Sequence, residues 1–309
     1  MIKFYKNRWI PFSISIILIA TGFILMFVNG VSLDIEFTGG AIMKYDYTGE
    51  INPDEAAGIA QNLFNRNVTA QNQTDLASGQ NRLVLNFSGK DGIEAGMQDS
   101  LDDALREAFP DANVKLWESS IVEAYLGAKF LQNSVTALIL AAIAIVIYVW
   151  IRFRRIGGLS AGVMSLVALI HDVLLVLFTF TVFGVPIGDS FVAVALTIIG
   201  YSINDTIVIY DRIRENSRIY KGLPLEELVD KSINQSLTRS INTSATVTIA
   251  IIIVYAFAFA NSIESIQNFA LPMAVGSICG CYSTIFIAGP LWVSWQKRKS
   301  GRAAAKSKA

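Results

Sequence analysis

Apolar residues gather in six long runs along the chain of 309 residues. Each run is about long enough to cross the roughly 30 Å hydrocarbon core of a bilayer as a helix. The first run is longer than the apolar core of a signal peptide and is followed by no small-x-small cleavage site, so we expect a retained membrane helix. The pattern therefore predicts six transmembrane spans, at residues 10–28, 131–151, 159–183, 191–209, 241–260 and 269–295.

The region between the first two runs has the mixed periodicity of a small α+β domain. Leu83, Leu85 and Phe87 alternate as in a strand, whereas apolar residues from 97 to 108 recur at helical spacing. Asn52-Pro53, followed by two acidic residues, is typical of a helix start. Strands are predicted at 41–47, 68–76, 80–87 and 113–118, and helices at about 52–65 and 97–108. This βαββαβ order predicts a ferredoxin-like domain.

Composition and charge favour a membrane protein, because 53% of the residues are hydrophobic and only 16% are charged. Residues 31–130 contain 16 acidic and 7 basic residues, and the other 18 basic residues lie in alternate loops and at the two ends. By the positive-inside rule, both termini are cytoplasmic and the first large loop lies outside. The predicted fold class is a polytopic α-helical membrane protein with six transmembrane helices and an α+β ferredoxin-like (βαββαβ) extracytoplasmic domain between helices 1 and 2.

The expected divisions of the chain follow from these spans. They are a cytoplasmic N-terminus at 1–9, transmembrane helix 1 at 10–30, the extracytoplasmic domain at 31–128, the bundle of transmembrane helices 2–6 at 129–296 with a cytoplasmic loop at 211–238, and a cytoplasmic basic tail at 297–309 that ends in a disordered segment. The expected location is the cytoplasmic membrane, with the chain crossing it several times.

Asp205 lies deep inside the fourth apolar run. A carboxyl group at this depth costs roughly 2.5–3.5 kcal/mol on insertion scales, so its default interpretation is functional. A helical projection places polar residues near it, and these are Thr197, Tyr201, Ser202 and the flanking Asn204. Burial disfavours the charged form of a carboxyl group and a nearby cation favours it. A carboxyl group held between the two influences can load and release protons.

Arg239, at the cytoplasmic entry of the fifth run, is the cation expected to meet Asp205. The alternative is that Arg239 only marks the membrane boundary. His171 and Asp172 lie together near the middle of the third run. They form either a satisfied hydrogen-bonding pair or a part of the proton path. Residues 119–132 are either a simple connector or a hinge.

Several classes of chemistry find no support in the sequence. A G-x-x-x-x-G-K-[ST] phosphate-binding loop is absent, no metal-ligand spacing stands out, and nothing points to a nucleic-acid partner. Cys279 and Cys281 are two residues apart in an apolar run, so they face different sides of a helix and predict neither a disulfide nor a metal pair. We expect no enzyme activity and no cofactor other than protons as the coupling ion.

Three segments resemble the SecD–SecF family of protein-export membrane proteins, within the resistance-nodulation-division superfamily, and in particular its smaller, SecF-type subunit. They are DIEFTGG, in which Glu36-Phe37-Thr38-Gly39-Gly40 is similar to a family D-F-x-G-G signature, GYSINDTIVIYDRIREN, and NQSLTRSINTS. The resemblance implies that Asp205 and Arg239 are the essential proton-relay pair and that Gly39 and Gly40 belong to a hinge or domain signature.

The resemblance also implies a function and partners. The chain would use the proton-motive force to assist late preprotein translocation across the cytoplasmic membrane. Its partners would be a SecD-like subunit, a SecYEG-type channel and the unfolded preprotein. Three other hypotheses stay open, and they are an aspartyl protease built on Asp172 and Asp205, a half-transporter exporting small molecules or lipids, and a static membrane scaffold.

Overall fold

The computed structural model describes all residues except 67, 75–79, 89–94, 123, 262 and 307–309. Its described part contains six helices that are long and apolar enough to cross a membrane, as the hydrophobic runs predicted. They are α1 (Trp9–Asn29), α5 (Ala124–Arg152), α6 (Gly158–Val182), α7 (Asp189–Ile219), α8 (Leu225–Ala260) and α9 (Glu264–Ser283). The last continues through a π-helical turn, η3 (Thr284–Ala288), into α10 (Gly289–Lys306).

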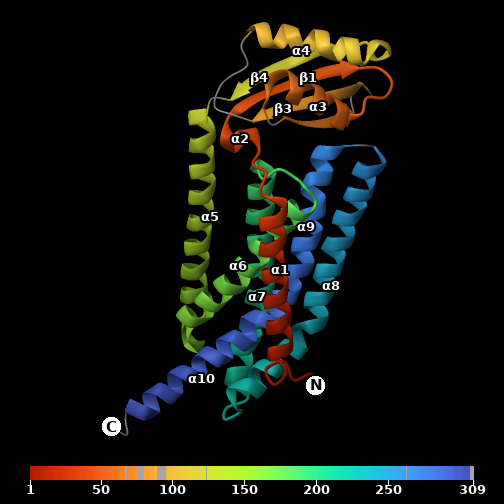
Figure 1. Ribbon diagram of the computed structural model, residues 1–309. Helices are drawn as coiled ribbons and strands as arrows, with labels where there is room; N and C mark the ends of the chain where they lie inside the picture. Colours follow the sequence, from red (N-terminus) through yellow and green to blue (C-terminus); the bar gives the residue numbers. More distant parts are fainter. Residues whose placement is uncertain (67, 75–79, 89–94, 123, 262, 307–309) are drawn as a thin grey trace.

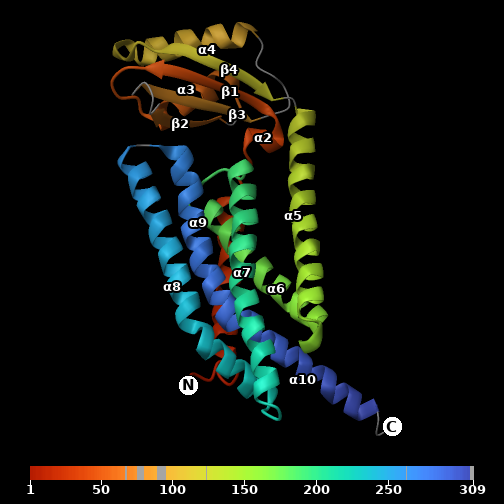
Figure 2. The ribbon, with the colours of Figure 1, turned by 180° about the vertical axis from the view of Figure 1, so that it is seen from behind.

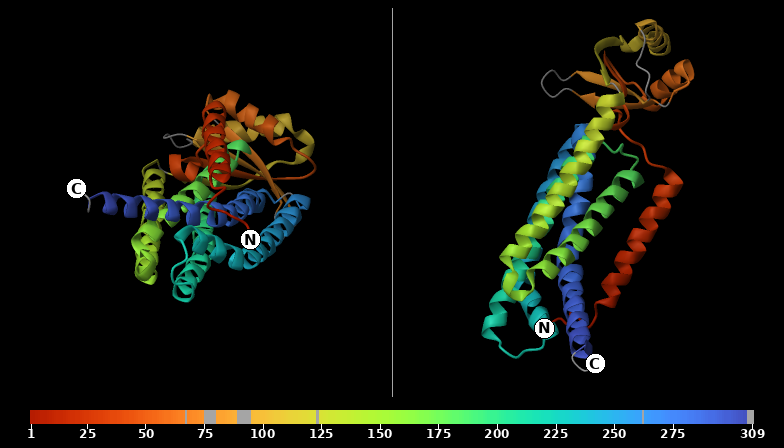
Figure 3. Two further views of the ribbon diagram at one scale, coloured as in Figure 1. Left: turned by 90° about the horizontal axis from the view of Figure 1, so that it is seen from below. Right: turned by 90° about the vertical axis from the view of Figure 1, so that its left-hand side faces the viewer.

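The helices form a bundle that carries a small sheet domain at one end, and the N-terminus and α10 lie at the other end (Figure 1). Within the bundle, α6 lies among α1, α5, α7 and α9, whereas α1, α5 and α8 leave most of their surface uncovered (Figure 3). The α5–α6 turn holds a short 3-10 helix, η2 (Arg154–Ile156). Glycines allow close approaches between helices, because a Cβ at Gly158 would lie 2.4 Å from Trp150 O of α5, and one at Gly276 would lie 2.7 Å from Ile198 Cγ1 of α7.

The region 211–238, expected as a cytoplasmic loop, is formed mainly by the ends of α7 and α8, which are joined by a turn at 220–224 (Figure 2). A buried amide holds the two helix ends together, because Asn216 Nδ2 donates to Ser232 Oγ at 2.8 Å. The ion pair between Arg212 and Glu215 stabilises the turns of α7 that extend beyond the predicted span at 191–209. The expected disorder of the C-terminal tail is wrong for residues 301–306, which continue α10 as an alanine-rich helical turn.

The described part of the sheet domain contains four strands in the order β2-β3-β1-β4, and every neighbouring pair is antiparallel. The strands are β1 (Gly40–Tyr47), β2 (Val68–Thr74), β3 (Asn81–Ser88) and β4 (Lys115–Val122). The helices are α3 (Pro53–Phe64) and α4 (Ala95–Ala108), followed by the 3-10 turn η1 (Pro110–Ala112). The element order is the predicted βαββαβ. One core joins alternate residues of β1 and β3 to the apolar faces of both helices, including Met43, Leu85, Ala60, Leu101 and Leu105.

The start of α3 confirms the capping prediction. Asn52 is extended, and its side-chain oxygen accepts the Asp54 N–H at 3.0 Å. Asn65 ends the helix in the left-handed conformation, with φ of 50°.

A short helix that the sequence did not predict, α2 (Ile35–Thr38), connects the bundle to β1. Two glycines follow it with positive φ values, 77° at Gly39 and 146° at Gly40. A Cβ at Gly40 would lie 1.9 Å from the Phe87 carbonyl oxygen, so the strand pairing requires glycine here. The segment before α2 is tied to the α6–α7 loop by a parallel bridge between Leu33 and Ile187.

Candidate functional site

Asp205 lies midway along α7 and is half-buried on the side that faces α8. Its Oδ1 accepts a hydrogen bond of 2.6 Å from the Ser240 hydroxyl of α8. Its Oδ2 is buried and has no hydrogen-bond partner among the described residues. One half of this carboxyl group is therefore satisfied by protein and the other half is not.

Arg239 precedes Ser240 on α8, and its charge acts on Asp205. Its side chain is exposed, and it makes no ion pair within 4.0 Å in the part of the chain that the structure describes. The structure thus brings α8 to Asp205 as expected, but the direct contact is made by a hydroxyl group and not by the guanidinium group.

A stripe of buried hydroxyl groups runs along α8 at four-residue spacing. Its members are Ser232, Ser236, Ser240, Ser244 and Thr248. Ser244 Oγ donates to the Ser277 carbonyl of α9 at 3.3 Å, and Thr248 Oγ1 lies 2.8 Å from Ser277 Oγ. Positions four apart share one face of a helix, so the stripe forms a continuous polar seam that contains the partner of Asp205.

Asp172 is the centre of a second polar cluster, in which α6, α7 and α9 meet, and it is fully buried. His171 Nδ1 lies 3.0 Å from its Oδ1, and the hydroxyls of Ser202 and Ser283 each donate to its Oδ2 at 2.7 Å. Thr206 and Thr284 extend the cluster with a hydroxyl contact of 2.9 Å. Both oxygens of this carboxyl group are therefore hydrogen-bonded.

The residues predicted to support Asp205 divide between different surroundings. Ser202 serves Asp172 and not Asp205. Tyr201 is half-buried and interacts with Ser244 of the α8 stripe. Thr197 is exposed and donates to the Ala193 carbonyl of its own helix at 2.7 Å, and Asn204 is exposed. The structure does not bring Thr197 or Asn204 into either cluster.

Sequence reasoning missed Ser240 and Ser283 as partners of the two carboxyl groups. A usable signal existed for Ser240, because the hydroxyl residues of the α8 stripe recur every four positions in the sequence. The neighbouring Arg239 was predicted instead of Ser240, because of its charge. Ser283 carries no comparable signal, because its role depends on how α9 packs against α6.

The two carboxyl groups share no hydrogen bond, because Asp205 Oδ1 binds Ser240 and its Oδ2 has no partner among the described residues. A shared proton needs carboxyl groups in contact, so the arrangement does not support an aspartyl protease pair. Among the described residues, three or more His, Cys, Asp or Glu side chains never gather closely enough to hold a metal ion. The arrangement instead offers a singly hydrogen-bonded carboxyl group at the α7–α8 contact.

Comparison with known proteins gives a consistent result. Residues 101–298 match the family described as "Protein export membrane protein SecD/SecF, C-terminal". The chain is 31% identical to the protein translocase subunit SecF of Petrotoga mobilis, over 96% of this chain and 97% of that protein. It is 35% identical to the protein translocase subunit SecDF of Brucella abortus, over 95% of this chain but 37% of that protein.

A solved structure shares the fold. The crystal structure of SecDF, described as a translocon-associated membrane protein from Thermus thermophilus, superimposes with a TM-score of 0.78 at 26% identity. The match covers 96% of this chain and 39% of that one. The chain therefore spans about two fifths of the solved SecDF protein.

Proposed function

The chain belongs to the SecD/SecF family of protein-export membrane proteins and is an accessory subunit of Sec protein export, and we propose that it couples proton movement through Asp205 to late preprotein translocation. The observation that carries the coupling is the half-satisfied carboxyl group at the contact between α7 and α8.

Protonation of Asp205 changes this contact in a defined way. As an anion, the group accepts the Ser240 hydroxyl at Oδ1 and leaves a buried Oδ2 without a donor. A proton bound at Oδ2 neutralises the charge and turns that oxygen into a donor. The anion attracts the nearby Arg239 and the neutral acid does not. Loading and release of a proton therefore shift the balance between two arrangements of α7 and α8.

The energy available from one proton is adequate for such a shift. One charge crossing 100 mV is worth about 2.3 kcal/mol. That energy changes a two-state equilibrium by about fiftyfold.

α7 offers a continuous path from Asp205 to the sheet domain. Asp189 begins the helix sixteen positions before Asp205, a distance of about 24 Å along a helix. The Asp189 N–H donates to Glu36 Oε2 of α2 at 3.1 Å, and α2 leads directly into β1. We propose Gly39, which lies between α2 and β1, and Gly40, the first residue of β1, as the hinge of this path.

The partners follow from the relatives. The SecDF relatives are single chains whose name combines SecD and SecF, and this supports a SecD partner for this chain. The largely uncovered surfaces of α1, α5 and α8 are suited to membrane contacts with such a subunit. We further propose a SecYEG-type channel and the unfolded preprotein as partners, the cytoplasmic membrane as the location, cytoplasmic termini, and a ferredoxin-like class for residues 31–128.

Export of a secreted reporter in cells whose only copy carries Asp205→Asn tests the coupling. Asparagine keeps the shape and the acceptor for Ser240 but cannot release a proton. We expect export to fall to the level of a strain without the protein, with normal protein level and normal assembly with SecD. The matched control is Asp211→Asn on the same helix, because Asp211 forms surface ion pairs with Arg152 and Arg214. Wild-type export by Asp205→Asn overturns the proton-relay proposal.

A further inference from the structure

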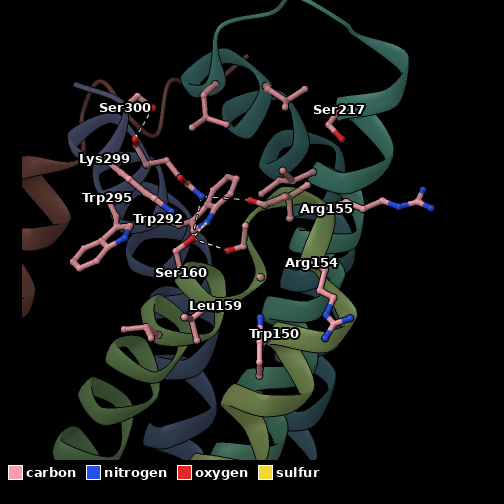
Figure 4. A pocket seen from close by; sticks show the side chains of 18 of the residues that line it. Trp150, Arg154, Arg155, Leu159, Ser160, Ser217, Trp292, Trp295, Lys299 and Ser300 are labelled. Carbon is pink, nitrogen blue, oxygen red and sulfur yellow. Dashed lines mark hydrogen bonds between the residues drawn. The ribbon is translucent and has the colours of Figure 1, made fainter. Parts of the chain in front are cut away.

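A large cavity lies at the end of the bundle that carries the N-terminus and α10. Its volume is about 1080 Å³, slightly above the range of about 300–1,000 Å³ common for small-molecule sites. Its walls come from the α5–α6 turn, the first turns of α6, the ends of α7 and α8, and α10 (Figure 4). None of the residues assigned above to proton movement lines it.

The walls of the cavity carry positive charge without neutralising partners. Among the described residues, four basic residues and no acidic residue line it; the four are Arg154, Arg155, Arg298 and Lys299. Their basic neighbours outside the cavity are ion-paired, since Arg152 binds Asp211 and Lys297 binds Glu226. Within the described chain, none of the four makes an ion pair within 4.0 Å. Such a concentration of one charge sign favours an anion.

The floor of the cavity is rigid and adds to the positive potential. Ser160, in the first turn of α6, donates to the Gly157 carbonyl at 2.6 Å and accepts from Trp292 Nε1 at 3.1 Å and Gln296 Nε2 at 3.0 Å (Figure 4). These bonds fix α10 against the start of α6. The positive end of the α6 dipole points into this region, because Gly157, Gly158 and Leu159 line the cavity.

One side of the cavity is apolar and uncovered. Trp150 is 42% exposed, Leu159 55% and Trp295 50%, and all three line the cavity together with Val163 (Figure 4). Tryptophan residues prefer the boundary between lipid and water, where basic residues can reach headgroups. A small inorganic anion would use the charged wall but would leave this apolar side empty. A molecule with a phosphate headgroup and acyl chains fits both.

We infer that this cavity is a binding site for an anionic phospholipid. The four basic residues and the start of α6 hold the phosphodiester headgroup, and the acyl chains lie along Leu159 and Val163. The site is independent of proton transfer at Asp205, so either conclusion can fail without the other.

Native mass spectrometry of the purified full-length protein, titrated separately with dioleoylphosphatidylglycerol, cardiolipin and dioleoylphosphatidylcholine, tests the site. The test variant is Arg154→Gln/Arg155→Gln/Arg298→Gln/Lys299→Gln. The control is Lys3→Gln/Lys6→Gln/Arg218→Gln/Lys221→Gln, which removes the same charge from exposed residues that do not line the cavity. We expect the wild type and the control to bind the anionic lipids preferentially, and the test variant to bind them at least about tenfold more weakly.

Three results would overturn the inference. They are an equal loss in the test and control variants, an unchanged preference in the test variant, and displacement of the lipid by millimolar inorganic phosphate, which would make the cavity a site for free phosphate. If the fourfold variant does not fold, Arg154→Glu and Lys299→Glu are measured singly. Each variant is expected to weaken binding of phosphatidylglycerol about fivefold. Wild-type affinity in both single variants would also overturn the inference.

Discussion

The Ser240 hydroxyl of α8 lies 2.6 Å from Asp205 Oδ1 of α7 and is the direct hydrogen-bond partner of that carboxyl group. Arg239 is adjacent in sequence and acts on Asp205 only through its charge. The direct hydrogen bond from α8 to Asp205 is therefore made by one hydroxyl group, which makes Ser240 as informative a target as the arginine.

Replacing Ser240 by alanine is expected to reduce export several-fold. The substitution removes a hydrogen bond to a charged group, and such bonds contribute about 1.5–3 kcal/mol. The measurement is the rate of reporter export at equal protein levels. Ser240→Thr keeps the hydroxyl and is expected to retain most of the activity, whereas equal rates for Ser240→Ala and wild type would show that the bond is dispensable.

Asp172 is expected to have a structural role. Asp172→Ala removes the hydrogen-bond partner of buried His171 and Ser202 and one of the two acceptors of Ser283, and it is predicted to lower the free energy of unfolding by about 3 kcal/mol or more. Asp172→Asn retains an acceptor oxygen for Ser202 and Ser283 and is predicted to stay near the wild type in thermal midpoint and in export. A stable Asp172→Asn protein that does not export would instead place Asp172 in the proton path.

The joint between α5 and α2 is expected to tolerate no side chain at Gly127. A Cβ there would lie 2.7 Å from Gly39 N and 3.0 Å from the Phe37 carbonyl. Gly127→Ala is predicted to destabilise the protein by about 1–3 kcal/mol through overpacking, measured as the thermal midpoint in detergent. Gly58→Ala is the matched control in α3, because a Cβ there meets nothing within 4 Å, and it is predicted to be neutral or slightly stabilising. Equal midpoints for both variants would contradict the tight joint.

The acidic residues in and just before α2 give the stability of the protein a pH dependence of defined sign. Burial and the charge of Asp189 raise the pKa of Glu36, and burial likewise raises the pKa of Asp34. The folded protein thus binds these protons more tightly than the unfolded chain. For Glu36, the stabilisation by the bound proton is complete below the ordinary pKa of 4.5 and is lost as the pH rises through the raised pKa of the folded protein.

Glu36→Gln is therefore predicted to match the wild type at low pH and to have the higher thermal midpoint at neutral pH. Glutamine keeps an oxygen for the Asp189 N–H and removes the charge. Exposed Glu50→Gln is the control and should leave the pH profile unchanged. A wild-type profile for Glu36→Gln would show that repulsion at the joint is negligible.

The sequence predicted the elements that depend on local periodicity and capping. The six spans, the βαββαβ order and the Asn52 cap all follow from patterns within a few residues. It did not predict which partner each side chain meets. Ser202 and Asp205 lie three positions apart, so a helical projection places them on one face, yet α7 packs between α6 and α8 and the two residues meet different helices.

α2 was missed for a similar reason. Four residues carry too little periodicity to indicate a helix, and α2 is stabilised by contacts with distant parts of the chain. Phe37 of α2 packs against Phe130 of α5, and Asp34 N–H donates to the Ile187 carbonyl at 3.0 Å. Such contacts depend on the assembled bundle and cannot be read from neighbouring residues.

The sheet domain joins α2 at β1 and α5 at β4 through very short connections. One residue separates β4 from α5, and one residue separates α2 from β1. Gly40 of β1 pairs with Val122 of β4, so both attachments lie at the same end of two neighbouring strands, and β2 forms the far edge of the sheet. Any rotation of the domain about these two attachments displaces β2 further than β1 or β4, and β2 is the strand that contacts α9.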